Sequence, residues 1–112
     1  MTTATLDLQA MQASASRACE LMKVLANPDR LLICCQLSQQ AMCVSELESS
    51  LGIVQPTLSQ QLTVLRNADL VATRREGKNI FYQLTSTSAL AVMNTLFQQF
   101  CNPPPQGAKN EY

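Results

Sequence analysis

Residues 55–67 constrain the fold most strongly, because they read as a helix with two very different faces. Leucines spaced by four and then three residues give one narrow apolar stripe, made of Leu58, Leu62 and Leu65. The polar residues outside this stripe are mainly Gln, Ser and Thr, whose uncharged side chains both donate and accept hydrogen bonds. Such side chains suit the reading of base edges in a DNA groove. The stretch therefore predicts a DNA-reading helix with four candidate contact residues: Gln55, Thr57, Ser59 and Gln60.

A shorter helix is expected just before this stretch, over residues 45–51. Ser45 is a suitable N-cap, acidic residues fill the first turn, and Gly52 is the kind of residue that ends a helix. Pro56 then stands near the start of the next helix. Two helices joined by a short turn that begins with Gly form the helix-turn-helix pattern. In such a pair the second helix enters the major groove of DNA with its N-terminal residues foremost.

The residues that follow predict a β-hairpin. Residues 70–76 read as an extended run, Gly77-Lys78-Asn79 is a turn signal, and residues 80–84 are rich in β-forming residues. The hairpin would carry a basic tip beside the DNA-reading helix. Its cationic side chains suit contacts to phosphate or to the minor groove. We therefore add three candidates for DNA contact: Arg74, Arg75 and Lys78.

Three more helices complete the expected fold. Helical periodicity predicts one helix over residues 14–26 and a second, buried and central, over residues 28–37, with Asn27-Pro28 between them. A last helix should begin at Ser86 or Ser88 and end near Cys101. The fold class is mainly α with a small β-hairpin: a winged helix-turn-helix of about five helices with a two-stranded wing. We expect an N-terminal extension over residues 1–13, the domain over 14–101 and a flexible C-terminal tail over 102–112.

The composition of the chain limits the classes of function that it can have. Eight basic and eight acidic residues give a net charge of zero, which argues against a non-specific nucleic-acid coat protein. The chain has no histidine, no paired carboxylates and no phosphate-binding loop, so we expect neither an enzyme nor a cofactor. The sequence shows no membrane-spanning run and no signal peptide, so we expect a cytoplasmic protein that does not bind membranes. Its five cysteines are then expected to be thiols rather than structural disulfides.

Several local strings resemble the ArsR/SmtB family of winged-helix repressors. They are Leu25-Ala-Asn-Pro-Asp-Arg-Leu-Leu-Ile, Ser45-Glu-Leu, Gln55-Pro-Thr-Leu-Ser-Gln-Gln-Leu-Thr-Val-Leu-Arg and Ile80-Phe-Tyr-Gln-Leu. The resemblance covers residues 15–101 and is specific as a set. It implies a symmetric homodimer, formed by the first and last helices, that binds palindromic double-stranded operator DNA and is released from it by a ligand.

Within that family the chain looks most like the persulfide-sensing BigR/SqrR subgroup. That resemblance implies a redox-sensing dithiol between Cys35 in the second helix and Cys101 at the end of the last. Cys34 adjoins Cys35, and counting from Pro28 and Arg30 favours Cys35 as the matching position. The implied inducers are persulfide or polysulfide donors, which would leave the two cysteines bridged by sulfur.

Two other interpretations stay open. Metal-sensing and arsenic-sensing members of the family carry a Cys-x-Cys string at the third helix, where this chain has Met42-Cys-Val-Ser and keeps only Cys43. Their other site needs His and carboxylates on the last helix, and residues 88–101 hold none. We therefore expect no metal, although metal(loid) or general thiol-redox sensing through Cys43 or other thiols remains an alternative. A DNA-binding module without a ligand, or a protein-interaction dimer, is a further alternative.

Overall fold

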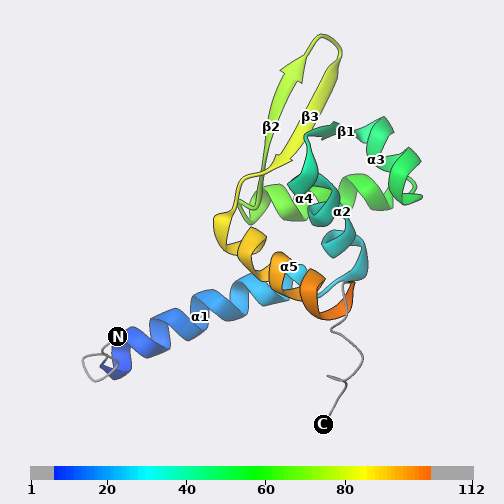
Figure 1. The fold of residues 1–112 in the computed structure, drawn as a ribbon. Coiled ribbons are helices and arrows are strands. Elements are labelled where there is room, and N and C mark those ends of the chain that lie inside the picture. Colours follow the sequence, from blue (N-terminus) through cyan, green and yellow to red (C-terminus); the bar gives the residue numbers. More distant parts are fainter. Residues whose placement is uncertain (1–6, 102–112) are drawn as a thin grey trace, which may run out of the picture.

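The computed structural model describes residues 7–101, which form five helices and a three-stranded antiparallel sheet (Figure 1). This confirms the mainly helical winged helix-turn-helix fold. In chain order the elements are α1 (Leu8–Leu25), α2 (Pro28–Gln39), β1 (Met42–Cys43), α3 (Val44–Leu51), α4 (Thr57–Asn67), β2 (Val71–Glu76), β3 (Asn79–Leu84) and α5 (Thr87–Phe100).

The sheet has one strand more than the predicted wing. β2 and β3 form the expected hairpin, paired from Val71 with Leu84 to Glu76 with Asn79 around the two-residue turn. On the other side of β3 the short strand β1 pairs Met42 with Tyr82 and Cys43 with Phe81. The prediction of a sheet with only the two strands of the wing was therefore incomplete. A two-residue strand is too short to show the alternation by which strands are found in sequences.

Three helix starts differ from the prediction. α1 begins at Leu8 instead of residue 14, because the Asp7 carboxylate caps it by accepting from the backbone N–H of Ala10 at 2.8 Å. The proposed boundary between extension and domain therefore falls inside α1. The N-cap of α3 is Cys43 rather than Ser45, and the Glu46 carboxylate accepts from the Cys43 backbone N–H at 3.1 Å. α4 begins at Thr57, two residues later than expected. The expected tail at 102–112 lies outside the described residues.

The core lies around α2, as predicted. Ile33, Cys34 and Leu37 of α2 are buried. The leucine stripe of α4 is buried against them, together with Leu47 of α3 and Met93 of α5. α2 is not covered on every side, however, because Leu32 and Cys35 are exposed. α2 therefore connects the helix-turn-helix to α5 while leaving one flank open.

Gly52 sets the angle between α3 and α4. Its backbone is left-handed, with φ of 73°, and its N–H donates to the Glu48 carbonyl at 2.9 Å. Glycine adopts this conformation without a steric penalty and is the usual residue at such a helix end. The predicted helix stop is confirmed, and α4 leaves the turn in the position of a second helix of a helix-turn-helix.

α1 and α5 leave much apolar surface uncovered. Figure 1 shows α1 extending away from the rest of the domain, and only its last turns pack on the core. Met11 of α1 is 52% exposed, while Phe97 and Phe100 of α5 are 54% and 78% exposed. The apolar side chains of α5 are therefore only partly buried, mainly at Ala89 and Met93.

No helix between residues 7 and 101 combines the length and the hydrophobicity needed to cross a membrane.

Candidate functional site

The polar candidates of the DNA-reading helix gather at its leading end. Ser59 and Gln60 are exposed, Thr57 is half-buried, and Gln55 lies in the turn just before α4. The Gln55 side-chain oxygen accepts from the Ser59 backbone N–H at 3.0 Å. Gln55 therefore satisfies one of the free N–H groups of the first turn, in addition to its predicted role in DNA contact. The leucines beneath are fully buried, so the polar face is held rigidly outward.

The three basic residues of the wing are not equivalent. Arg74 donates from Nε to the Glu76 carboxylate at 2.8 Å, and its guanidinium lies over the Phe81 ring, 5.4 Å from the centroid. Arg75 and Lys78 are exposed, and neither makes a side-chain hydrogen bond or ion pair with another residue in the range 7–101. Because Arg74 is held against its own hairpin, Arg75 and Lys78 are the cations most available to DNA.

We expect Arg75→Ala to weaken DNA binding on all sequences alike and to lower the slope of log affinity against log salt by about one. The reason is that Arg75 is exposed and can reach phosphate without giving up another partner. Arg74→Ala is the matched control and should change the slope less. Fluorescence anisotropy over a salt series measures both slopes, and an unchanged slope for Arg75→Ala would contradict the assignment.

A cleft of about 460 Å³ lies between the wing, the start of α3 and the turn that precedes α4. Gln55 and Lys78 line it together, so two residues from separate predicted motifs lie at one place. Cys43 is buried at the same cleft, with its Sγ 3.3 Å from the Ser45 hydroxyl. Between residues 7 and 101 no three His, Cys, Asp or Glu side chains are grouped so that they could hold a metal ion.

Cys35 and Cys101 line one pocket of about 250 Å³ between α2 and the end of α5. The other lining residues are all apolar: Leu31, Met93, Leu96, Phe97 and Phe100. The sequence alone could not place two thiols on different helices beside each other. In the structure the two predicted cysteines line the same pocket, and no charged side chain lines it.

The neighbouring Cys34 is a different kind of thiol. It is fully buried in the core, and this burial raises its pKa to about 12, with a smaller contribution from Cys35 and an opposing one from Arg30. A thiolate is the reactive form of cysteine, so Cys34 is a structural residue rather than a reactive one. The sequence left an ambiguity between the two adjacent positions, and the structure puts Cys35 in the pocket.

The pKa of Cys35 is raised. The larger cause is desolvation of the thiol by the apolar side chains of the pocket, although the residue as a whole is exposed, and the second cause is the negative charge of a Cys101 thiolate. We therefore expect alkylation of Cys35 by iodoacetamide to be slow near pH 7. It should accelerate about tenfold per pH unit until the raised pKa is passed. Cys101→Ser removes one of the two causes, so it should lower the pKa of Cys35 and speed its alkylation at a given pH. Peptide mass spectrometry measures the rate, and a rate that does not change with pH or with this substitution would contradict the prediction.

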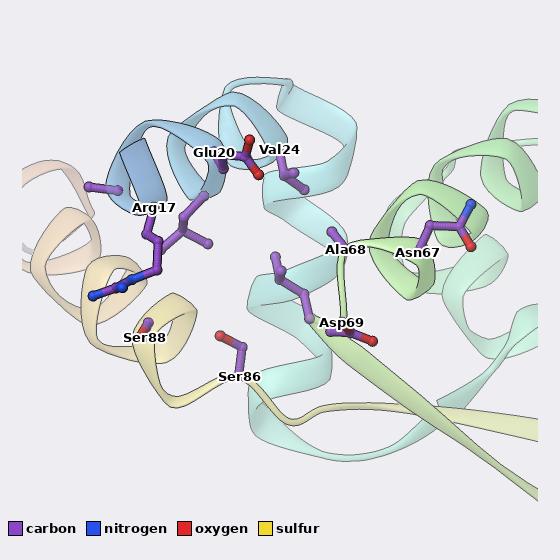
Figure 2. A pocket seen from close by; sticks show the side chains of 11 residues that line it. Arg17, Glu20, Val24, Asn67, Ala68, Asp69, Ser86 and Ser88 are labelled. Atoms are coloured by element: carbon purple, nitrogen blue, oxygen red, sulfur yellow. The ribbon is translucent and has the colours of Figure 1, made fainter. Parts of the chain in front are cut away.

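A larger cleft of about 670 Å³ lies between α1, the turn after α4 and the start of α5 (Figure 2). Arg17 and Glu20 of α1 line one side, Asp69 lies in the turn, and Ser86 and Ser88 belong to the α5 end. Sequence patterns gave no sign of this cleft, because three segments distant in the chain build it. It contains no cysteine, so it is separate from the dithiol pocket.

These elements define the class of protein. A helix-turn-helix with an outward polar face, followed by a β-hairpin with basic residues, is a winged helix-turn-helix domain. Residues 27–73 match the family described as "Bacterial regulatory protein, arsR family".

Known relatives and solved structures agree with this class. The chain is 49% identical to the biofilm growth-associated repressor of Agrobacterium fabrum over 96 residues, which is 86% of this chain and 82% of that protein. It is 40% identical to the transcriptional activator HlyU of Vibrio cholerae, over 88% of this chain and 91% of HlyU. The crystal structure of the transcriptional repressor BigR from Xylella fastidiosa superimposes with a TM-score of 0.79 at 44% identity, over 86% of this chain and 98% of BigR. The chain therefore belongs to the arsR family of bacterial regulatory proteins and is a transcriptional regulator, not an enzyme.

Proposed function

We propose that this regulator is a homodimeric repressor that binds palindromic operator DNA when reduced and releases it when sulfur bridges Cys35 and Cys101. The observation that carries the proposal is the shared apolar pocket of these two thiols. The names of the similar proteins in Agrobacterium and Xylella, both repressors, support repression as the outcome of DNA binding.

The homodimer is supported by the uncovered apolar side chains of α1 and α5. Exposed large hydrophobic residues on these helices include Leu8, Met11, Met22, Phe97 and Phe100. Exposed apolar patches commonly mark protein–protein interfaces. A twofold dimer would present two copies of α4 and two wings. The half-sites of its operator would then lie about one helical turn apart.

The sulfur chemistry balances with a persulfide donor RSSH. Each cysteine thiolate attacks the outer sulfur of one donor, so each becomes a cysteine persulfide and each releases a thiol RSH. The terminal sulfur of one cysteine persulfide, as its thiolate, then attacks the inner sulfur of the other and displaces hydrosulfide. The product is a trisulfide between Cys35 and Cys101, and the displaced sulfur carries away the two electrons lost by the thiols.

An added sulfur also relaxes the geometry of the bridge. A direct disulfide needs Cα atoms about 4.4–6.8 Å apart and a narrow torsion. A longer bridge spans a wider separation with less strain, which favours a persulfide over a peroxide as the inducer. In either case the bridge ties the end of α5 to α2, and α2 packs on α4. A coupling free energy of about 1–3 kcal/mol between bridge formation and DNA binding would change the affinity for the operator about 5–150-fold.

Operator binding by the wild-type protein tests this function directly. Fluorescence anisotropy should show tight binding by the reduced dimer and release after treatment with a persulfide donor, with smaller effects of peroxide, arsenite and zinc. Release by arsenite or zinc alone would support metal(loid) sensing instead. Binding that none of these reagents changes would indicate a DNA-binding module without a ligand, and absence of DNA binding at low salt would indicate a protein-interaction dimer.

A further inference from the structure

Arg30, in the first turn of α2, contacts two other helices through one guanidinium group. Nε donates to the Val24 carbonyl at 2.6 Å and Nη2 to the Lys23 carbonyl at 3.3 Å, both near the C-terminal end of α1. Nη1 donates to the side-chain oxygen of Gln61, on α4, at 2.8 Å. Arg30 and Gln61 are both half-buried. The planar fork of the guanidinium therefore fixes the directions of all three bonds at once.

The bond to Gln61 differs from the other contacts between α2 and α4. Buried apolar side chains make up the rest of this contact, among them Ile33 and Leu62. Apolar contacts have little directional preference, whereas a charge-assisted hydrogen bond prescribes distance and angle. Within residues 7–101, Arg30 to Gln61 is the one side-chain hydrogen bond that joins α2 to α4. It is therefore the side-chain contact between α2 and α4 that prescribes a direction for α4.

α2 also carries the candidate sensing thiol. Leu31, next to Arg30, and Cys35, five residues from Arg30, both line the dithiol pocket. On its other side Arg30 holds the end of α1, a helix of the expected dimer interface. Gln61 is next to Gln60, which belongs to the polar face of α4. One short segment of α2 thus contacts the sensing pocket, the dimer helix and the recognition helix.

We propose that Arg30 is the positioning residue that couples the dithiol to the recognition helix, with Gln61 as its acceptor on α4. This inference rests on the proposed function. Bridging Cys35 to Cys101 draws α2 against α5. Because one guanidinium holds both Gln61 and the end of α1, α4 and the end of α1 move with α2 and change their orientation relative to α5. The spacing of the two recognition helices in the dimer changes with it.

Substitution of Gln61 tests the coupling without disturbing the contacts of Arg30 with α1. Gln61→Leu removes the acceptor. Gln61→Glu keeps an acceptor oxygen at the same place, and its negative charge strengthens the hydrogen bond from Arg30. The matched control is Gln36→Leu: Gln36 is also half-buried on α2, and its amide donates to the Ser50 hydroxyl of α3 at 3.1 Å. The quantity measured is the ratio of operator Kd after persulfide treatment to Kd before it. Mass spectrometry of each sample verifies the bridge.

We expect Gln61→Leu to reduce this ratio by at least about fivefold. Gln61→Glu and Gln36→Leu should keep the wild-type ratio. A bridged Gln61→Leu protein with the wild-type ratio would overturn the coupling role, as would an equal loss in Gln36→Leu. Wild-type protein that is bridged and still binds DNA fully would overturn the proposed function itself. The two failures are therefore distinguishable in one set of samples.

Discussion

Cys101→Ser is expected to bind operator DNA like the wild-type protein when reduced and to keep binding it after persulfide treatment. A single remaining thiol, Cys35, can accept sulfane sulfur but cannot close a bridge between α2 and α5. The ratio of treated to reduced Kd should therefore be about one, against the 5–150-fold change that a coupling of this kind gives. Cys101 is exposed at the end of α5, so serine there should change the free energy of unfolding by less than about 0.5 kcal/mol.

Two other cysteines serve as controls for this experiment. Cys19 is exposed on α1, outside the pocket, so Cys19→Ser should respond like the wild-type protein. Cys43 tests the alternative sensing thiol, and Cys43→Ala should also keep the response. If Cys101→Ser is released fully by the donor, or if Cys43→Ala alone loses the response, the dithiol assignment is wrong.

Phe97→Asp is expected to convert the reduced dimer to a monomer and to weaken operator binding by about a hundredfold or more, because the gain from two linked half-sites is lost. The Phe97 side chain is 54% exposed within the chain, so burying the exposed half in a dimer would contribute about 0.8–1.6 kcal/mol per protomer, roughly half of the value for a fully exposed side chain. A carboxylate in the same place would be buried without a partner, which adds a further penalty. Sedimentation gives the mass, and anisotropy gives the operator affinity.

A second substitution separates this effect from the dithiol pocket, which Phe97 also lines. Met11→Asp, on α1 and away from the pocket, should produce the same monomer. The control is Val54→Asp. Val54 is also an exposed apolar residue, but it lies in the turn between α3 and α4 and belongs to neither interface helix. This substitution should leave the dimer mass unchanged. A Phe97→Asp protein that still sediments as a dimer would contradict the predicted interface.

The helical part of the fold was predictable because its signals are local. The leucine stripe of α4, the Gly52 stop and the Ser86 cap of α5 each depend on a few neighbouring residues, and the structure confirms them. β1 could not be predicted, because its two residues become a strand only by pairing with Tyr82 and Phe81 of β3. The predicted N-cap of α3, Ser45, was wrong for a related reason. A cysteine at the N-cap gives a weak sequence signal, and the Glu46 bond to its backbone decided the start.

The candidate site was predictable to a smaller extent. Exposure of Ser59 and Gln60 follows from the periodicity of α4, whereas the lesser availability of Arg74 depends on Glu76 and Phe81 in three dimensions. The proximity of Cys35 to Cys101 came from a family resemblance, since no periodicity links residues on separate helices. The bond from Arg30 to Gln61 spans 31 positions and has no sequence signature.

The most direct test combines operator binding with mass spectrometry of peptides from the same persulfide-treated sample. The proposed mechanism predicts that DNA release rises in parallel with a cross-linked pair of peptides containing Cys35 and Cys101. The mass of this pair should equal the two reduced peptides plus one sulfur less two hydrogens. Release of DNA without any peptide pair bridged between these two cysteines, or a complete bridge in protein that still holds its operator, would contradict it.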